Sequence, residues 1–156
     1  MFRRIFPFAL FVGVAALAAG PAPGQDKKAL AAELKRLDGT WEVLGAVRDG
    51  ESVPKEKRDA MRLVVKAGAY EQRVDGKAVE KGKVRFVGEE QKVLFVEFTP
   101  ADGPNKGKAL TGLLEWLDPD GARVTVPLKA GGGRPLRPGS EPGSGMALMI
   151  YKRAQE

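Results

Sequence analysis

The residues that could carry chemistry in this chain are almost all carboxylates. The 156-residue sequence contains no histidine and no cysteine. A Ser-His-Asp triad, a thiol nucleophile, a histidine general base and a histidine-ligated zinc are therefore excluded. Without thiols the fold also has no disulfide, so its core alone must hold it together. Only chemistry by paired carboxylates remains.

Glu97 and Glu115 are the candidates for such a pair, because they fall on neighbouring predicted strands. A glycosidase uses two carboxylates that face each other across a sugar ring. Each of these glutamates, however, has an apolar residue on both sides in an alternating strand, which turns the carboxylate outward to solvent. The sequence therefore predicts a protein that is not an enzyme, with a carboxylate-only hydrolase as the less favoured alternative.

The segment 103–108, GPNKGK, invites comparison with a phosphate-binding loop. Its spacing is one residue short of G-x-x-x-x-G-K, and Ala109 stands where Ser or Thr must hold magnesium. The loop also joins two strands and does not lead into a helix whose N-terminus could receive phosphate. We expect an ordinary hairpin loop here, and the sequence predicts neither a cofactor nor a metal site.

The segment 129–145 is rich in glycine and proline and has no periodicity. It is too long for an ordinary hairpin connection, and its glycines and prolines, which interrupt helices and strands, predict a mobile loop. Arg134 and Arg137 lie near glycine N–H groups, and such a combination could hold an anionic group at the mouth of a barrel. The alternative is a solvated connector.

The first 24 residues have the pattern of a cleaved signal peptide. Arg3 and Arg4 precede an almost wholly apolar run at 5–19, and small residues follow at the spacing that a signal peptidase recognises. The run has about 15 residues, fewer than the roughly 20 that span a bilayer. We expect residues 1–24 to be removed, no stable membrane span to remain, and the mature protein to be periplasmic or extracellular.

The charge balance does not point to a nucleic-acid partner. The formal net charge is +6, and removal of Arg3 and Arg4 with the signal peptide leaves 24 basic and 20 acidic residues, or +4. Basic residues are spread along the chain, often beside acidic ones as at 55–59. This distribution is typical of a mixed solvated surface, so we expect no nucleic-acid partner.

Two kinds of periodicity divide the mature chain. Residues 25–36 form a linker and an N-terminal helix, which reaches Leu37 and places Leu30 and Leu34 on the same face. Residues 37–156 form one domain in which apolar and polar residues alternate, as in half-buried strands. Asp75-Gly76 gives the strongest hairpin signal. The predicted strands are 41–47, 61–67, 69–74, 78–87, 92–99, 109–117, 122–128 and 146–152.

Eight short sequential strands after one amphipathic helix favour an all-β antiparallel up-and-down barrel, because closure removes the exposed sheet edges. An eight-stranded barrel is just wide enough to be filled by its own side chains or to hold one small ligand. The residues expected to point inward are Trp41, Val43, Val47, Leu63, Val65, Val84, Phe86, Leu114, Trp116, Val124, Val126, Leu148 and Ile150. Because most are bulky, a filled or narrow interior is slightly favoured.

Several segments together resemble a known family. Gly39-Thr40-Trp41 after a short helix is similar to the G-x-W motif of lipocalin-like barrels. The ordered set 37–41, 48–50, 103–108 (GPNKGK), 142–145 (PGSG) and 151–153 resembles a lipocalin-like domain family best known from planctomycete bacteria. The resemblance covers roughly 34–153. It implies an eight-stranded lipocalin-like barrel, usually exported, with no established activity.

The resemblance also implies structural roles and shows two departures. The tryptophan of the motif, Trp41 beside Gly39, would pack across the closed end of the barrel. Arg153, or failing it Lys152, would lie over the indole ring, whose face attracts a cation. The chain departs from the family at Val126, where many members carry a cysteine. It also lacks, in the long loop, the acidic and aromatic residues often found after Arg-Pro.

We therefore expect an exported, monomeric lipocalin-like module that binds a small apolar or amphipathic molecule in its barrel. In that interpretation four aromatic residues form apolar walls and two arginines a polar lid. These are Tyr70, Phe86, Phe95 and Trp116 for the walls, and Arg134 and Arg137 for the lid. The alternative is a structural or interaction domain with a filled core, which contacts an envelope protein through the 129–145 loop.

Overall fold

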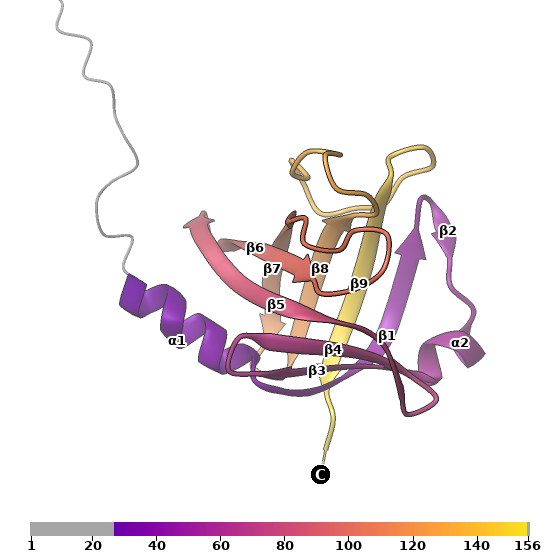
Figure 1. Cartoon of the computed structure of the whole chain (residues 1–156), viewed down its shortest axis with the longest axis horizontal. Helices are drawn as coiled ribbons and strands as arrows, with labels where there is room; N and C mark the ends of the chain where they lie inside the picture. Colours follow the sequence, from indigo (N-terminus) through magenta and orange to yellow (C-terminus); the bar gives the residue numbers. More distant parts are fainter. Residues whose placement is uncertain (1–26, 156) are drawn as a thin grey trace, which may run out of the picture.

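The structure is a computed structural model that describes residues 27–155. The predicted signal peptide, 1–24, lies outside the described residues. Within these residues, two short helices and nine strands follow one another (Figure 1): α1 (Lys27–Leu37), β1 (Gly39–Arg48), β2 (Glu51–Ser52), α2 (Lys55–Asp59), β3 (Met61–Lys66), β4 (Ala69–Val74), β5 (Lys77–Glu90), β6 (Val93–Pro100), β7 (Leu110–Asp118), β8 (Gly121–Pro127) and β9 (Met146–Arg153).

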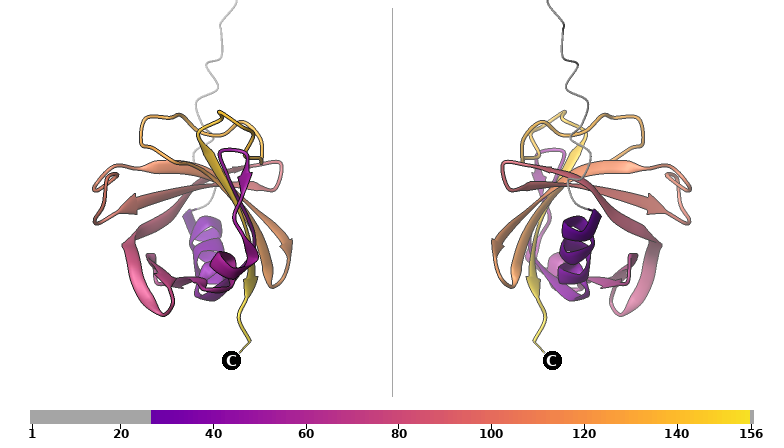
Figure 2. Two further views of the ribbon diagram at one scale, coloured as in Figure 1. Left: turned by 90° about the vertical axis from the view of Figure 1, so that its right-hand side faces the viewer. Right: turned by 90° about the vertical axis from the view of Figure 1, so that its left-hand side faces the viewer.

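The strands form one closed antiparallel barrel. β3 to β9 pair in sequence order, and β1 pairs with β3 on one side and β9 on the other, which closes the sheet. Figure 2 shows the strands wrapped around a common axis. The predicted all-β, eight-stranded antiparallel barrel with an N-terminal helix is therefore confirmed. The sequence did not predict β2, a two-residue strand that pairs with the end of β1 and is too short to show alternation.

The Asp75-Gly76 turn forms as the sequence predicts, and Asp49-Gly50 forms a second turn of the same kind. Asp49 and Gly50 have φ values of 49° and 85°, and Asp75 and Gly76 have values of 51° and 75°. Positive φ at both central residues is what a type I′ turn requires, and this turn follows the natural twist of paired strands. These turns give β1–β2 and β4–β5 their tight connections.

The two ends of the barrel are built differently. At one end α1 lies against the barrel, with Leu30 and Leu34 packed on the core and Leu37 fully buried. At the other end the chain makes its longest connections, at 49–60, which contains the short helix α2, and at 101–109 and 128–145 (Figure 1). The second end is therefore the mouth of the barrel.

The sequence analysis placed Leu148 and Ile150 inside the barrel, and this was wrong. The inward residues of β9 are Ala147, Met149 and Tyr151, which line the interior, and Tyr151 is buried. Because side chains alternate along a strand, Leu148 and Ile150 face outward. The error has a simple cause: residues 146–151 are all apolar, so the strand shows no alternation from which its orientation could be inferred.

Gly82 is required where three strands approach one another. A Cβ atom at this position would lie 2.4 Å from the Thr99 carbonyl oxygen, 2.7 Å from Cε1 of Tyr70 and 2.9 Å from Cα of Pro100. Two of these atoms belong to the backbone of β6, so they cannot move aside cheaply.

We predict that Gly82→Ala lowers the free energy of unfolding by about 1–3 kcal/mol, because the added methyl overpacks the β4–β5–β6 contact. Urea denaturation measures the change. Gly45→Ala is the matched control, since the nearest atom to its Cβ is the tip of Ile150 at 3.3 Å. Equal stability of the two variants would contradict this explanation for the glycine.

Candidate ligand-binding cavity

The closed end of the barrel is organised around Trp41. Its side chain is 1% exposed, and its indole N–H donates to the Leu37 carbonyl at 2.9 Å. The Arg153 guanidinium lies 4.3 Å from the centroid of the indole ring, within the range of a favourable cation–π contact. Arg153 also donates to the carbonyls of Asp38 and Arg36, at 2.7 and 2.8 Å. One side chain therefore ties the last strand to the start of the first.

Arg153 also explains the glycine of the G-x-W motif. A Cβ atom at Gly39 would lie 2.7 Å from Nη1 of Arg153, and the φ of Gly39 is +133°. This backbone conformation is rarely adopted by residues with a side chain. Gly39 is therefore the residue that lets the guanidinium reach the ring of Trp41.

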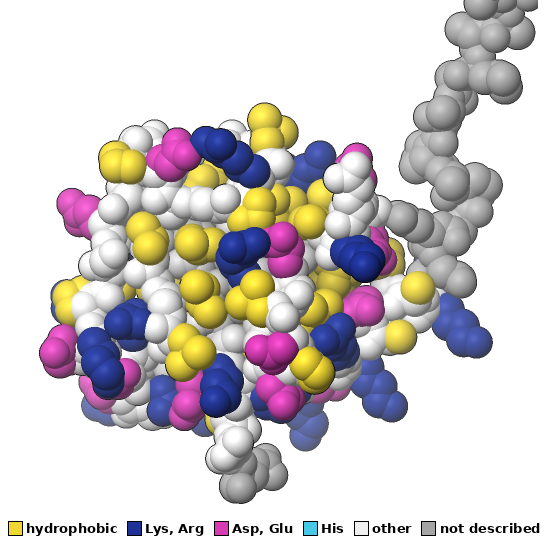
Figure 3. Space-filling view, turned by 180° about the vertical axis from the view of Figure 1, so that it is seen from behind, with side chains coloured by type: hydrophobic (Ala, Val, Ile, Leu, Met, Phe, Trp, Pro, Cys, Tyr) yellow, Lys and Arg dark blue, Asp and Glu magenta, His cyan; other side chains and the backbone are white. Residues whose placement is uncertain are grey.

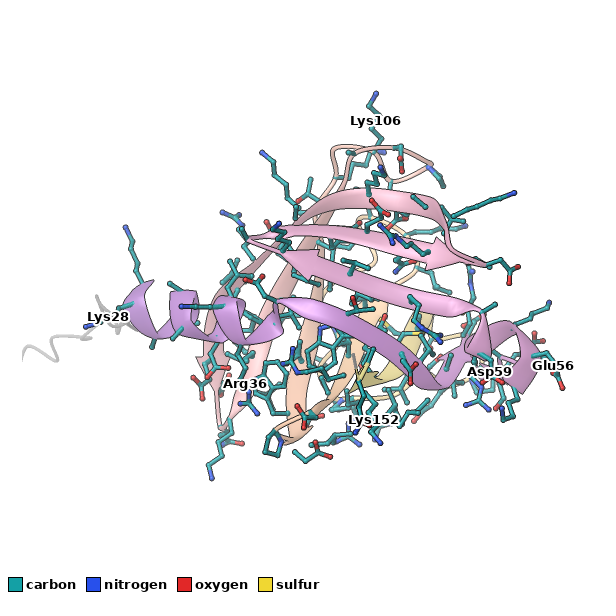
Figure 4. The ribbon with its side chains drawn as sticks, turned by 90° about the horizontal axis from the view of Figure 1, so that it is seen from below. Lys28, Arg36, Glu56, Asp59, Lys106 and Lys152 are labelled. Atoms are coloured by element: carbon teal, nitrogen blue, oxygen red, sulfur yellow. The ribbon has the colours of Figure 1, made fainter. Side chains whose placement is uncertain are left out.

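A second tryptophan and arginine complete the closed end. Trp116 packs against Trp41 with ring centroids 6.0 Å apart, and its indole N–H donates to Glu33 at 2.7 Å. The Arg36 guanidinium lies 3.9 Å from the centroid of Trp116. Arg36 and Glu33 both belong to α1, and Figure 4 shows Arg36 at the end of this helix, beside the strands. The helix is thus fastened to the barrel by polar as well as apolar contacts.

We predict that Arg153→Met lowers the free energy of unfolding by about 2 kcal/mol, because it removes the cation–π contact and leaves two carbonyls without their donor. Chemical denaturation followed by tryptophan fluorescence measures the loss. Arg85→Met, at an exposed pair with Glu97, is the control and should change stability by less than about 0.5 kcal/mol. Similar losses in both variants would show that Arg153 is not a special contact.

A cavity of about 300 Å³ occupies the barrel on the side of the mouth. Each of the eight barrel strands contributes to its wall, so it is the interior of the barrel and not a surface depression. Its volume lies at the lower end of the range for small-molecule sites. The apolar residues that line it are Val47, Val53, Met61, Leu63, Phe98, Pro104, Leu110, Val124, Val126, Pro127, Leu128, Ala147 and Met149.

Two tyrosines and a glutamate form a polar cluster in this apolar wall. The Tyr70 hydroxyl donates to Oε1 of Glu80 at 2.7 Å, and the Tyr70 ring packs edge-on against Phe98 with centroids 5.3 Å apart. Tyr151 is also buried, and burial together with the charge of Glu80 raises the pKa of its phenol. Burial, and then the hydrogen bond to Glu80, raises the pKa of Tyr70. Glu80 thus acts on both phenols.

The loops at the mouth hold one another. The Asp49 carboxylate accepts from the Gly145 N–H at 2.8 Å, and the Gly50 N–H donates to the Ser140 hydroxyl at 3.3 Å. On the opposite side, the amide of Asn105 accepts from the N–H of Ala130 at 3.0 Å and donates to the Leu128 carbonyl at 3.2 Å. The sequence predicts a mobile 129–145 loop, whereas the structure ties it to both neighbouring loops.

Three of the segments that carry the family resemblance meet at this mouth. They are 48–50, 103–108 and 142–145, and the hydrogen bonds of Asp49 and Asn105 run between them and the long loop. Lys106 points away from the fold in Figure 4 and is not among the residues that line the cavity. The GPNKGK loop therefore contributes an asparagine that holds the rim.

The structure brings only one of the six predicted ligand contacts to the cavity. Tyr70 lines it, whereas Phe86 is buried in the core and Trp116 belongs to the closed end. Phe95 points outward, because its neighbours Leu94 and Val96 are the buried members of β6. Of the four aromatic residues expected to form the apolar walls of the ligand site, only Tyr70 lies at the cavity.

The predicted lid of Arg134 and Arg137 is also absent from the mouth. The Arg134 guanidinium lies 4.1 Å from the ring centroid of Phe95 on the outside of the barrel, and Arg137 pairs with Glu141 at 2.6 Å. Neither arginine lines the cavity. Residues 134–139 fold back over the outer face, where the Gly139 N–H donates to Thr125 at 3.3 Å. A loop without periodicity gives no signal for such a path.

Glu80, Gln72 and Tyr151 are cavity residues that the sequence analysis missed. Gln72 stands two residues after Tyr70 on β4 and pairs with Glu80 across the strands. Once Tyr70 is taken as inward, strand alternation places Gln72 on the same face and Glu80 opposite it. Glu80 lies in a lysine-rich strand, which is typical of an exposed surface and concealed this signal.

Other parts of the described chain offer weaker candidates. A hollow of about 590 Å³ lies on the outer side of β3 to β6, but it is open and has lysines at its rim. Glu97 and Glu115 face outward and pair with Arg85 and Arg123, at 2.7 and 2.8 Å, so they do not form an acid–base pair. Within residues 27–155 no cluster of three or more possible metal ligands occurs, and no helix is long and apolar enough to cross a membrane.

The surface seen from behind carries both signs of charge. In Figure 3, lysines and arginines are interspersed with aspartates and glutamates over this face, and hydrophobic side chains lie between them. No single basic patch dominates the face in that view. This face therefore offers no continuous basic track for a phosphate backbone.

The two cavity tyrosines generate a prediction about alkaline pH. Both have a pKa in the folded protein well above the ordinary value of 10.0. A raised pKa means that the folded state keeps its protons when the unfolded state loses them, so stability falls as the pH rises above about 10. Since the chain has only two tyrosines, both of them in the cavity, tyrosinate absorbance reports on this site alone.

We therefore expect little tyrosinate absorbance from the folded protein at about pH 11, where the urea-unfolded chain is largely ionised. Tyr151→Phe should reduce the fall in the free energy of unfolding above about pH 10. The fall is compared with that of the unsubstituted protein, because lysines titrate in the same range in both and their contribution cancels. Ionisation of both tyrosines near pH 10 without unfolding would contradict the burial of these hydroxyls.

Comparison with known proteins places no family name on the chain. No protein-family model matches it, and no curated protein does. Among solved structures, the chain is similar to the crystal structure of a mutant of the fluorescent protein UnaG. The sequence identity is 17%, the TM-score is 0.36, and the match covers 79% of this chain and 99% of the other.

Proposed function

We propose that this protein binds a small apolar or amphipathic molecule inside its barrel and performs no catalysis. The observation that supports the proposal is the 300 Å³ cavity, which has walls from all eight strands and a polar cluster at Tyr70 and Glu80. A concave, mostly apolar site with a few converging polar groups is typical of small-molecule binding. The lipocalin-like resemblance of the sequence is compatible with the same role.

The proposal includes export of the mature chain to the periplasm or the extracellular space. The sequence pattern of residues 1–24 supports it. In that setting a monomeric barrel could carry or capture a ligand without a membrane anchor.

A second candidate function is protein binding through the 129–145 loop. Leu136 is 95% exposed, although Arg134 and Gly139 on either side of it are held against the barrel. An apolar side chain presented on an anchored loop suits contact with an envelope protein. The cavity nevertheless favours ligand binding, because a purely structural domain has no need of it.

Native mass spectrometry of protein isolated gently from its own envelope extract tests the first proposal. We expect a small molecule that is retained under native conditions and lost on denaturation. Ala147→Phe, which fills the cavity from β9, should abolish this adduct. Leu148→Phe, one residue along and facing outward, is the control and should keep it. An adduct that survives Ala147→Phe would contradict binding in the barrel.

A further inference from the structure

The charged groups around the cavity are unevenly placed. Glu80 is the one carboxylate among the lining residues and Arg48 the one cation. Arg48 is an exposed residue at the end of β1, so water screens its charge. Glu80 is partly buried and is held by the Tyr70 hydroxyl through one of its two oxygens. The field inside the cavity is therefore set mainly by a carboxylate.

Glu80 also has a free acceptor position. Its Oε1 accepts from Tyr70, and no partner for Oε2 occurs among residues 27–155. The other polar atoms beside it are the Tyr151 hydroxyl and the amide of Gln72, its cross-strand neighbour. Asp102, in the loop at the mouth, adds a second negative charge close enough to act on Tyr70. A ligand head group here meets the negative charge of Glu80, beside a hydroxyl and an amide that can each donate or accept a hydrogen bond.

Resting on the proposed function, we propose that the ligand carries a hydrogen-bond donor or a positive charge on its apolar body, as a primary ammonium does, and that Glu80 binds it. A carboxylate head group is rejected, because two carboxylates cannot share so apolar a site without one of them losing its charge. Hydrogen bonds between an ammonium and a carboxylate are among the strong ones.

The size of the cavity limits the apolar body. At about 300 Å³ it has about twice the volume of engineered apolar cavities of about 150 Å³, which take up benzene. A single short alkyl chain or one to two small rings fit this space, whereas a long acyl chain does not. The site therefore selects compact amphiphiles by both length and charge.

Isothermal titration calorimetry with three probes of equal chain length tests the proposal: 1-octylamine, 1-octanol and octanoate, each at neutral pH below the concentration at which it forms micelles. We expect octylammonium to bind at least about tenfold more tightly than octanoate, which corresponds to about 1.4 kcal/mol. Octanol should lie between them. Glu80→Gln should remove the preference for octylammonium over octanoate and change octanol binding least, because the glutamine oxygen still accepts from a hydroxyl.

Glu97→Gln is the matched control, because Glu97 lies outside the barrel with Arg85. It should keep the affinities of the unsubstituted protein. If the three probes bind but octanoate binds as tightly as octylammonium, the inference about the head group is wrong and the proposed function stands. If a preference for octylammonium persists in Glu80→Gln, Glu80 is not its cause. If no probe binds, the proposed function fails together with the inference.

Discussion

The pairing of β1 with β9 is the interaction on which the rest of this structure depends. Their ladder runs from Trp41 opposite Arg153 to Arg48 opposite Ala147. It converts a sheet with two exposed edges into a closed barrel, which gives every strand an inner and an outer face. The first pair of the ladder builds the closed end, and the last pair lies at the mouth.

The two ends of the barrel differ in how their interiors are filled. At the closed end, Trp41 and Trp116 fill the interior, and Arg153 and Arg36 cover their rings. Large side chains packed there leave no space for a ligand. Toward the mouth the inward residues of β9 are Met149 and the small Ala147, and both line the cavity. Stability and binding are therefore separated along the barrel axis.

Much of the fold could be predicted from the sequence, because its signals are local. Alternation identified most of the barrel strands, and Asp75-Gly76 marked a hairpin that needs only two residues to form. The position of Arg153 over Trp41 came from the resemblance to lipocalin-like barrels. The cavity could not be predicted in the same way, since the orientation of an all-apolar strand such as β9 depends on its partners.

The long loop shows why the candidate site was the hardest part to predict. Arg134 was expected at the mouth, yet it stacks on Phe95 outside the barrel because residues 134–139 return over β6 to β8. That path is decided by contacts between distant segments. Glu80 shows the opposite error. Its strand is polar in sequence and looks exposed, yet this carboxylate lines the interior.

Methionine methyl groups offer the most direct test of the cavity, which is the central claim. Met61 and Met149 line it, whereas Met146 lies on the outward side of β9. In NMR spectra of protein labelled at the methionine methyls and titrated with 1-octanol, the account predicts saturable shifts for Met61 and Met149 and none for Met146. Unchanged signals from both cavity methionines, or a shift confined to Met146, would contradict a binding site inside the barrel.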